Sequence, residues 1–338
     1  MKKLFFSLVA LICATMSYAQ SSLIATLSHD GEISTFYGTS ALRDAHAAAQ
    51  HGDIITLSSG SFTSVTITKA ITLRGAGMQV DTVAKTNPTI ITGDFDINIP
   101  DSVEQRLTME GVFHNNNLLV RGTLKNASFL KNKFLFFYVD GIVTNSTFIH
   151  CKISNYSNDN NTNSANFVNS YIRTNSDCSI YNAFFTNCFV VCQRPNLILQ
   201  STFNNCILYS TYSYSTSYAD YRFLNSNCAA YYCVTVSHDG TLFHLINNQT
   251  NINYGLDYAL DNLFITYKGS YTDEETFELT DEAKAKYLGS DGTEVGIHGG
   301  ALPFDPTPTN PQITKCNVAS KSTADGKLSV DIEVSATE

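Results

Sequence analysis

Three aspartates recur about one repeat apart in the middle of the chain: Asp140, Asp159 and Asp177. If they occupy equivalent places in successive coils, their carboxylates stack about 5 Å apart. Two such charges repel by roughly 3 kcal/mol at an effective dielectric constant of 20, so the column needs a cation or full solvation. Carboxylates gathered in this way suit Ca²⁺, and the column is our candidate metal site. The alternative is that each aspartate is a turn residue bonded to local backbone, as Asp140-Gly141 indicates.

A run of tyrosines separated by serine and threonine is the second candidate site. Alternate residues of a strand share a face, and exposed aromatic faces rimmed by hydroxyl groups suit sugar stacking or protein contact. The alternative is that these rings fill the interior of the fold. The candidate ligand-binding residues are Tyr209, Tyr212, Tyr214, Tyr231 and Tyr232.

We identify no catalytic set in the sequence. The eight histidines show no metal-ligand spacing, and neither a serine–histidine–aspartate nor a cysteine–histidine combination stands out. An enzyme would therefore have to rely on the three-aspartate column. The sequence leaves the protein without an assigned catalytic residue.

A repeat of 18 to 20 residues predicts the elements that position these side chains. Its marker is a phenylalanine column, with a small residue two positions earlier and Asn, Ser or Cys three positions later. The short alternation of small and large residues predicts brief strands, and one coil per repeat predicts a parallel β-helix. Asn, Ser, Thr and β-branched residues disfavour a helical repeat. The column is Phe129, Phe148, Phe167, Phe185, Phe203 and Phe223.

The cysteines follow the same repeat. Cys151, Cys188 and Cys206 occupy a column that also holds serine and asparagine, which favours buried packing residues over a disulfide framework. A bridge between Cys188 and Cys206 on neighbouring coils stays open as the alternative. The cysteines beyond residue 20 are Cys151, Cys178, Cys188, Cys192, Cys206, Cys228, Cys233 and Cys316.

The net charge of the chain and its first 19 residues indicate which partners to exclude and where the protein is located. Lys+Arg 21 against Asp+Glu 30 gives a net charge of −9, which excludes nucleic acid as a partner because phosphate binding needs clustered cations. Residues 1–19 combine a dilysine start, a short apolar run and small residues before the expected cleavage site, as in a secretory signal peptide. No later stretch is apolar enough to span a membrane. We expect export, to the medium, the cell surface or the periplasm of a Gram-negative bacterium.

The residues before the repeat carry a resemblance to a known superfamily. A helix expected at 41–50 precedes His51-Gly52-Asp53 and short strands that include VTITKAITLRGAG at 65–77. This stretch resembles the N-terminal cap and first coils of the right-handed parallel β-helix superfamily, the pectin-lyase-like fold. The resemblance implies a helix that covers the open end of the coil. It implies no single activity, since the superfamily includes lyases, hydrolases, epimerases and adhesins.

We therefore expect an all-β protein: a right-handed parallel β-helix with an N-terminal capping helix and a C-terminal β-hairpin tail. The expected parts are the signal peptide at 1–19, the β-helix at 20–300, a proline-rich linker at 301–311 and the hairpin at 312–338. The hairpin is too small for its own core, so we expect it to contact the coil or a partner.

The expected function is a non-catalytic, secreted or surface-exposed protein that binds a polysaccharide, a cell-surface glycan or a partner along an Asn/Tyr-rich face. The first alternative is a polysaccharide lyase or glycoside hydrolase that uses the three-aspartate column. The second is a structural adhesin or spacer.

Overall fold

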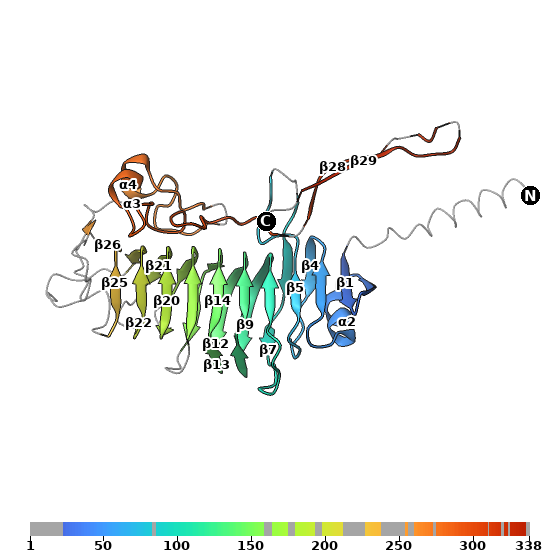
Figure 1. Cartoon of the computed structure of the whole chain (residues 1–338), viewed down its shortest axis with the longest axis horizontal. Helices are drawn as coiled ribbons and strands as arrows, with labels where there is room; N and C mark the ends of the chain where they lie inside the picture. The colour runs from blue at the N-terminus through green and yellow to red at the C-terminus, as the bar shows by residue number, and fades with distance from the viewer. Residues whose placement is uncertain are drawn as a thin grey trace, which may run out of the picture.

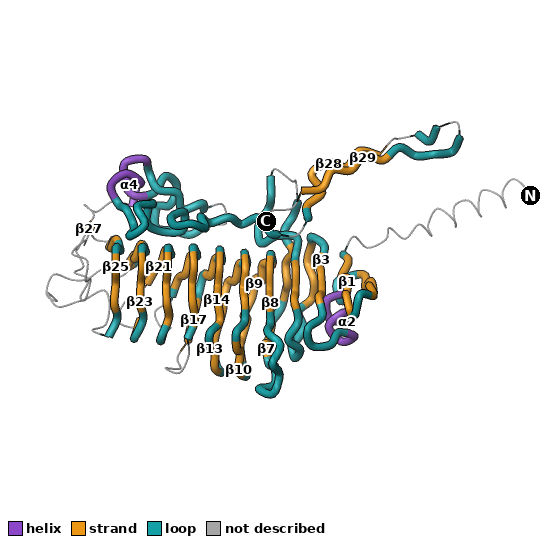
Figure 2. The backbone as a smooth tube through the Cα atoms, viewed as in Figure 1, coloured by secondary structure: helices purple, strands orange, loops and turns teal. Residues whose placement is uncertain are grey.

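The structure is a computed structural model, and it describes residues 23–82, 86–158, 164–174, 180–192, 198–211, 227–237, 254–255, 260–272, 275–309, 311–318, 321–323 and 325–335. These residues form an all-β parallel solenoid with very little helix, as expected (Figures 1 and 2). Successive coils add their strands to the same sheets, so that each sheet runs along the solenoid axis.

The first sheet, sheet A, begins with an antiparallel pair and continues with parallel strands. Its order is β2 (Glu32–Tyr37), β1 (Ile24–His29), β3 (Ile54–Leu57), β5 (Thr72–Arg74), β8 (Thr108–Glu110), β11 (Ser128–Leu130), β14 (Ser146–Ile149), β17 (Ala165–Val168), β20 (Ala183–Thr186), β23 (Thr202–Asn204) and β25 (Ala229–Tyr231).

The second sheet, sheet B, forms another side of the coil. Its strands are β4 (Gly60–Thr63), β6 (Thr89–Thr92), β7 (Phe95–Ile97), β9 (Val112–Val120), β12 (Lys133–Val139), β15 (Lys152–Ile153), β16 (Tyr156–Asn158), β18 (Tyr171–Arg173), β21 (Phe189–Cys192), β24 (Ile207–Ser210), β26 (Val234–Ser237) and β27 (Tyr254–Gly255). Two short pairs form the third side: β10 (Thr123–Lys125) with β13 (Ile142–Thr144), and β19 (Ile180–Tyr181) with β22 (Ile198–Leu199).

The phenylalanine column forms a stacked ladder inside the solenoid, as the repeat predicts. Phe129 and Phe148 have ring centroids 4.7 Å apart and planes 8° apart. Phe185 and Phe203 continue the stack at 4.6 Å and 1°. Because parallel strands in register bring identical residues one strand spacing apart, each coil adds one ring to the core.

The coil after Phe203 is longer than the sequence repeat indicates. Ala230 of β25, not Phe223, is in register with Phe203. Thr235 is in register with Leu208 on this coil, and the Sγ of Cys228 accepts the N–H of Ser201. Phe223 itself lies outside the described residues.

Two sharp corners on most coils connect the strands of sheet A to their neighbours. The corner residues adopt positive φ, a conformation that Asn tolerates better than most residues. The corner after each strand carries Lys131, His150, Asn169, Asn187, Asn205 and Tyr232; the corner before it carries Asn126, Asn145, Asn182 and Gln200. The frequent Asn of the repeat is thereby explained.

The cysteine column forms a hydrogen-bonded ladder, and the packing role predicted for these residues is confirmed where the structure describes them. Six cysteines, Cys151, Cys188, Cys192, Cys206, Cys228 and Cys233, are buried free thiols. The Sγ of Cys206 accepts from the N–H of Cys188 at 3.4 Å, and Ser170 Oγ accepts from the N–H of Cys151 at 2.9 Å. Cysteine and serine do the same work here, which is to satisfy a buried N–H of the preceding coil.

Helix α2 (Ala41–Ala48) covers the N-terminal end of the core, as expected from the sequence. Ala41, Leu42 and Ala45 are fully buried on its inner face. His46, on the same helix, accepts from the N–H of Thr68 through Nε2 at 3.3 Å.

The C-terminal residues double back along the solenoid (Figure 1). Helices α3 (Leu260–Leu263) and α4 (Asp281–Lys286) lie within a cover, residues 260–272 and 275–287, that packs on the outward face of sheet B. A strap, residues 288–309, then runs back along the corner after sheet A. Residues 301–309, part of the expected proline-rich linker, lie against the solenoid through contacts of Leu302, Asp305 and Thr309.

The final segment forms the predicted hairpin, from β28 (Gln312–Val318) and β29 (Val330–Ser335). Figure 2 shows this ribbon projecting away from the coils. Leu328, Val330, Ile332 and Val334 are each at least half exposed. Within the described residues the hairpin thus leaves an apolar row uncovered. Among the described helices, none is long and apolar enough to cross a membrane.

Candidate binding surface

The predicted tyrosines are not gathered on one exposed face where the structure describes them. Tyr209 is 1% exposed, and its ring packs edge-on against Tyr267 of the cover at a centroid distance of 6.3 Å. Tyr231 ends strand β25 and is half-buried, and Tyr232 follows at a corner with φ of 52°. Tyr212 and Tyr214 lie outside the described residues. Tyr231 and Tyr232 thus stay candidates, whereas Tyr209 is enclosed.

Of the three predicted aspartates, the structure describes only Asp140. It is exposed in a turn, where the N–H groups of Asp140 and Gly141 both donate to Val120 O. Asp159 and Asp177 lie outside the described residues, so the Ca²⁺ prediction stays untested. Elsewhere along the described ranges, no group of three or more His, Cys, Asp or Glu side chains is placed to hold a metal ion.

Over strands β18 to β26 the outward face of sheet B is closed to a large ligand, because the cover buries it. Tyr171 stacks on Phe277 of the cover, with ring centroids 4.5 Å apart. Further along, Phe189 contacts both Phe264 and Tyr267. The N-terminal side of this face carries Lys133 and Lys152, which are buried as well.

The outward face of sheet A is the extended face that neither the cover nor the strap buries. Strand register places its side chains in two rows along the solenoid axis. All are half-buried, as expected on the outside of a flat sheet, except Phe184, which is 51% exposed. The rows are Ser128, Thr147, Asn166, Phe184, Thr202, Ala229 and Leu130, Ile149, Val168, Thr186, Asn204, Tyr231.

Phe184 and Tyr231 are the aromatic residues of this face. Phe184 lies between Asn166 and Thr202 of the adjacent coils, and Tyr231 lies beside Asn204. Two coils and two residues separate the aromatic pair, which places their Cα atoms roughly 12 Å apart. An extended ligand, rather than one small ring, could contact both.

No side chain of the two rows carries a charge at neutral pH, although the chain as a whole has a net charge of −9. The first charged groups beyond the rows are on β5 and β8, where Arg74 Nε lies 3.9 Å from Glu110 Oε2. Neutral hydroxyl, amide, aliphatic and aromatic groups therefore make up the whole surface. Such a surface offers hydrogen bonds and ring stacking, and its one ionisable side chain is the phenol of Tyr231.

Phe184 was missed by the sequence analysis. The signal was present, because the position before the phenylalanine column is Ser128, Thr147, Asn166 and Thr202 on other coils. An aromatic residue in a column of small polar residues marks a local difference in surface chemistry.

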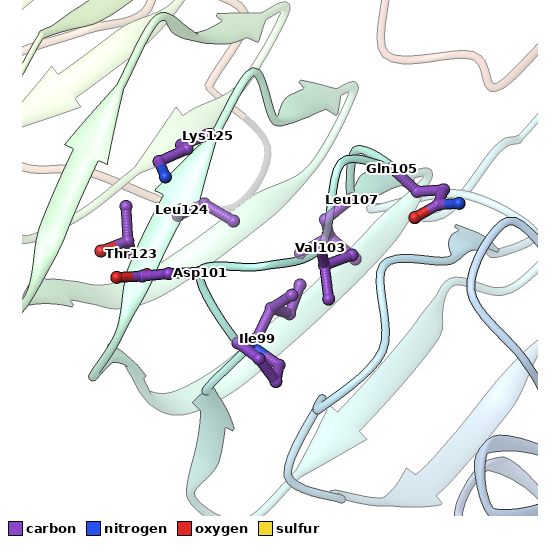
Figure 3. Close-up of a pocket in the computed structure, with 9 residues that line it drawn as sticks. Ile99, Asp101, Val103, Gln105, Leu107, Thr123, Leu124 and Lys125 are labelled. Carbon is purple, nitrogen blue, oxygen red and sulfur yellow. The ribbon is translucent and has the colours of Figure 1, made fainter.

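A shallow hollow between the 99–107 loop and β10 is a smaller candidate site (Figure 3). Its lining supplies a single carboxylate, from Asp101, and a single ammonium group, from Lys125. A pair of carboxylates, which glycoside hydrolysis and Ca²⁺ binding both favour, is not available there. The remaining lining residues are Ile99, Pro100, Val103, Gln105, Leu107, Thr123 and Leu124.

His29 and Asp53 form the one close histidine–carboxylate hydrogen bond among the described side chains. Nδ1 of His29 lies 2.8 Å from Oδ1 of Asp53, which is 8% exposed. The same carboxylate accepts the N–H of Gln50, so it also fixes the turn after α2. The other polar contacts of the ring are with Asp30 and Gln50. These hydrogen bonds join the end of β1 to the turn after α2.

The buried thiols do not supply a nucleophile either. Burial raises the pKa of Cys151 to about 12, and it raises the pKa of Cys192 to about 12 as well. A thiol must lose its proton to act as a nucleophile, so these groups are inert at neutral pH.

Comparisons with protein-family models, curated proteins and solved structures give no match for this chain. The assignment of the fold as a parallel solenoid is therefore based on the structure alone. The finer assignment to the pectin-lyase-like superfamily stays a prediction from the resemblance at 41–77.

Proposed function

We propose that this protein is a non-catalytic binding module that holds a neutral polysaccharide along the outward face of sheet A. The observation that carries the proposal is a long face without charged side chains, on which Phe184 is 51% exposed. Aromatic rings stack on the apolar faces of sugars, and the neighbouring Asn and Thr side chains can exchange hydrogen bonds with sugar hydroxyls.

The periodicity of the surface supports an extended ligand. Equivalent side chains recur about every 4.8 Å along the solenoid, so a chain molecule lying along the axis meets the same groups repeatedly. The signal-like residues 1–19 support a secreted or cell-surface location, where polysaccharides are available. The enzymatic alternative rests on the three-aspartate column, of which the structure describes only Asp140, in an exposed turn.

The proposal is tested by affinity gel electrophoresis of residues 20–338 in a panel of neutral polysaccharides. We expect retention by at least one of them, and we expect Phe184→Ala to weaken it about tenfold. Leu328→Ala is the matched control, because Leu328 is equally exposed at 51% but lies in the hairpin segment. Equal retention of both variants, or no retention of the wild-type protein, would refute the proposed surface.

A further inference from the structure

Strand β2 forms an open end of sheet A. Within the described residues it pairs only with β1, on one of its two edges. All of its residues except Phe36 are exposed, with Ile33 at 71% and Tyr37 at 50%. The strand contains no proline, lysine or bulge, the usual features that keep an edge from pairing with another chain.

The turn between β1 and β2 determines which backbone groups face the open edge. Asp30 and Gly31 both have positive φ, as in a two-residue hairpin turn that is closed by the pair His29 and Glu32. Hydrogen-bonded pairs alternate along an antiparallel ladder. Residues 32, 34 and 36 therefore bond to β1, and the N–H and C=O groups of residues 33, 35 and 37 point outward.

We propose that β2 pairs with β2 of a second copy of this chain, so that two solenoids join end to end through a continuous sheet A. The two-fold axis passes through Thr35, which lies opposite Thr35 of the other copy. Ile33 of each copy then lies opposite Tyr37 of the other. Every outward N–H and C=O of residues 33, 35 and 37 gains a partner in this register.

The strand is self-complementary, which favours a second copy over an unrelated strand. Aromatic rings opposite β-branched residues and threonine opposite threonine are both favourable cross-strand pairs. Glu32, the charged residue of β2, falls opposite Gly38, so no like charges meet. Ile33, Thr35 and Tyr37 share one face of the strand, and pairing partly covers that face.

Disulfide trapping tests the register. Hydrogen-bonded antiparallel neighbours have Cα atoms about 5.5 Å apart, within the range a disulfide can bridge. We expect Thr35→Cys to form a covalent dimer under mild oxidation. Ile33→Cys is the control, because the two copies of residue 33 lie four residues out of register and should not join. Equal cross-linking of both variants, or of neither, would overturn the proposed pairing.

Sedimentation velocity over a range of protein concentrations tests the association without a cross-link. We expect a monomer–dimer equilibrium for the wild-type protein. Thr35→Lys places two ammonium groups opposite each other at the two-fold axis and should weaken the dimer about tenfold or more. Ile332→Lys, in the equally exposed hairpin, should leave it unchanged. A monomer at every concentration, or a dimer lost only in Ile332→Lys, would overturn the proposal.

Discussion

At the scale of single residues, the inner ladder shows why cysteine and serine alternate in one column. Each coil turns a backbone N–H into the interior, and the next coil must supply an acceptor for it. Cys206 does so for Cys188, and Cys233 does so for Cys206, both at 3.4 Å. The sequence alone predicted this exchange of residue types, because the repeat is local and regular.

We expect Cys206→Ser to keep most of the stability and Cys206→Ala to lose about 1–3 kcal/mol. The alanine variant leaves the buried N–H of Cys188 without its acceptor, whereas the serine hydroxyl can replace the thiol. Urea unfolding followed by circular dichroism measures the difference. Equal stability of the two variants would show that the thiol acts through its volume alone.

Two histidines of the N-terminal cap respond to pH in opposite directions. Burial, helped by the charge of Lys69, lowers the pKa of His46 to about 4. The hydrogen bond to Asp53 raises the pKa of His29 above its ordinary value of 6.5. His46 is therefore neutral in the folded protein at neutral pH, whereas His29 binds its proton more tightly in the folded protein than in the unfolded chain.

For His46 the unfolded chain binds the proton more tightly, so acid favours unfolding. The contribution of neutral His46 to the free energy of unfolding is complete above pH 6.5 and is lost as the pH falls toward 4. The shift in its pKa corresponds to roughly 3 kcal/mol. We expect urea unfolding of His46→Gln to show a smaller loss between pH 7 and pH 4.5 than the wild type. Parallel curves for the two proteins would contradict this origin.

The contribution of His29 has the opposite sign. The stability that His29 adds is complete below 6.5, the pKa of the unfolded chain. It is lost as the pH rises through the higher pKa of His29 in the folded protein. We expect His29→Gln to cost more stability at pH 6 than at pH 9, measured by the same urea unfolding. A larger cost at pH 9 would contradict the ion pair with Asp53.

At the scale of elements, the strap shows where local sequence patterns fail. His150 bonds to Leu302 O at 3.0 Å, and Asn169 Nδ2 bonds to Gly299 O at 2.7 Å. Gly300 passes so close to Asn187 that an added Cβ would lie 2.0 Å from its Nδ2. These contacts join residues far apart in the chain. The sequence repeat identifies the corner residues, but it does not identify the distant segment that contacts them.

Lys131 is the firmest attachment of the strap. Its Nζ lies 2.9 Å from Asp305 Oδ2 and also donates to Thr307 O. Although burial opposes the charge, the hydrogen bonds from Lys131 and Thr307 hold the pKa of Asp305 below its ordinary value. The Lys131 side chain is 7% exposed and that of Asp305 is 42% exposed, so the ammonium group is buried while water still reaches the carboxylate.

We expect Lys131→Met to loosen residues 301–309 and to cost about 1–3 kcal/mol, because the charged hydrogen bonds of a buried ammonium group are lost. Hydrogen exchange measured by mass spectrometry should show faster exchange in that segment. Lys327→Met is the control: Lys327 pairs with Asp325 at 3.0 Å but is 82% exposed. Exchange that is unchanged in Lys131→Met would show that other contacts hold the strap.

At the scale of the whole molecule, the two large sheets differ in what covers their outward faces. The repeat predicted the solenoid and its phenylalanine ladder, and the residues at 41–50 predicted the helix at its N-terminal end. It could not predict that the cover would bury Tyr209 and leave the outward face of sheet A open, because that depends on packing between distant parts of the chain. The candidate face consequently moved from a tyrosine run to the rows that contain Phe184 and Tyr231.

The most direct test of a non-catalytic, uncharged binding face is one combined assay of the wild-type protein with acidic and neutral polysaccharides. It records retention, reducing ends and absorbance at 235 nm, with Ca²⁺ or with a chelator. We predict retention by a neutral polysaccharide without turnover, unchanged by the chelator and little changed by salt. Turnover that requires Ca²⁺ would contradict the account and favour a polysaccharide lyase instead.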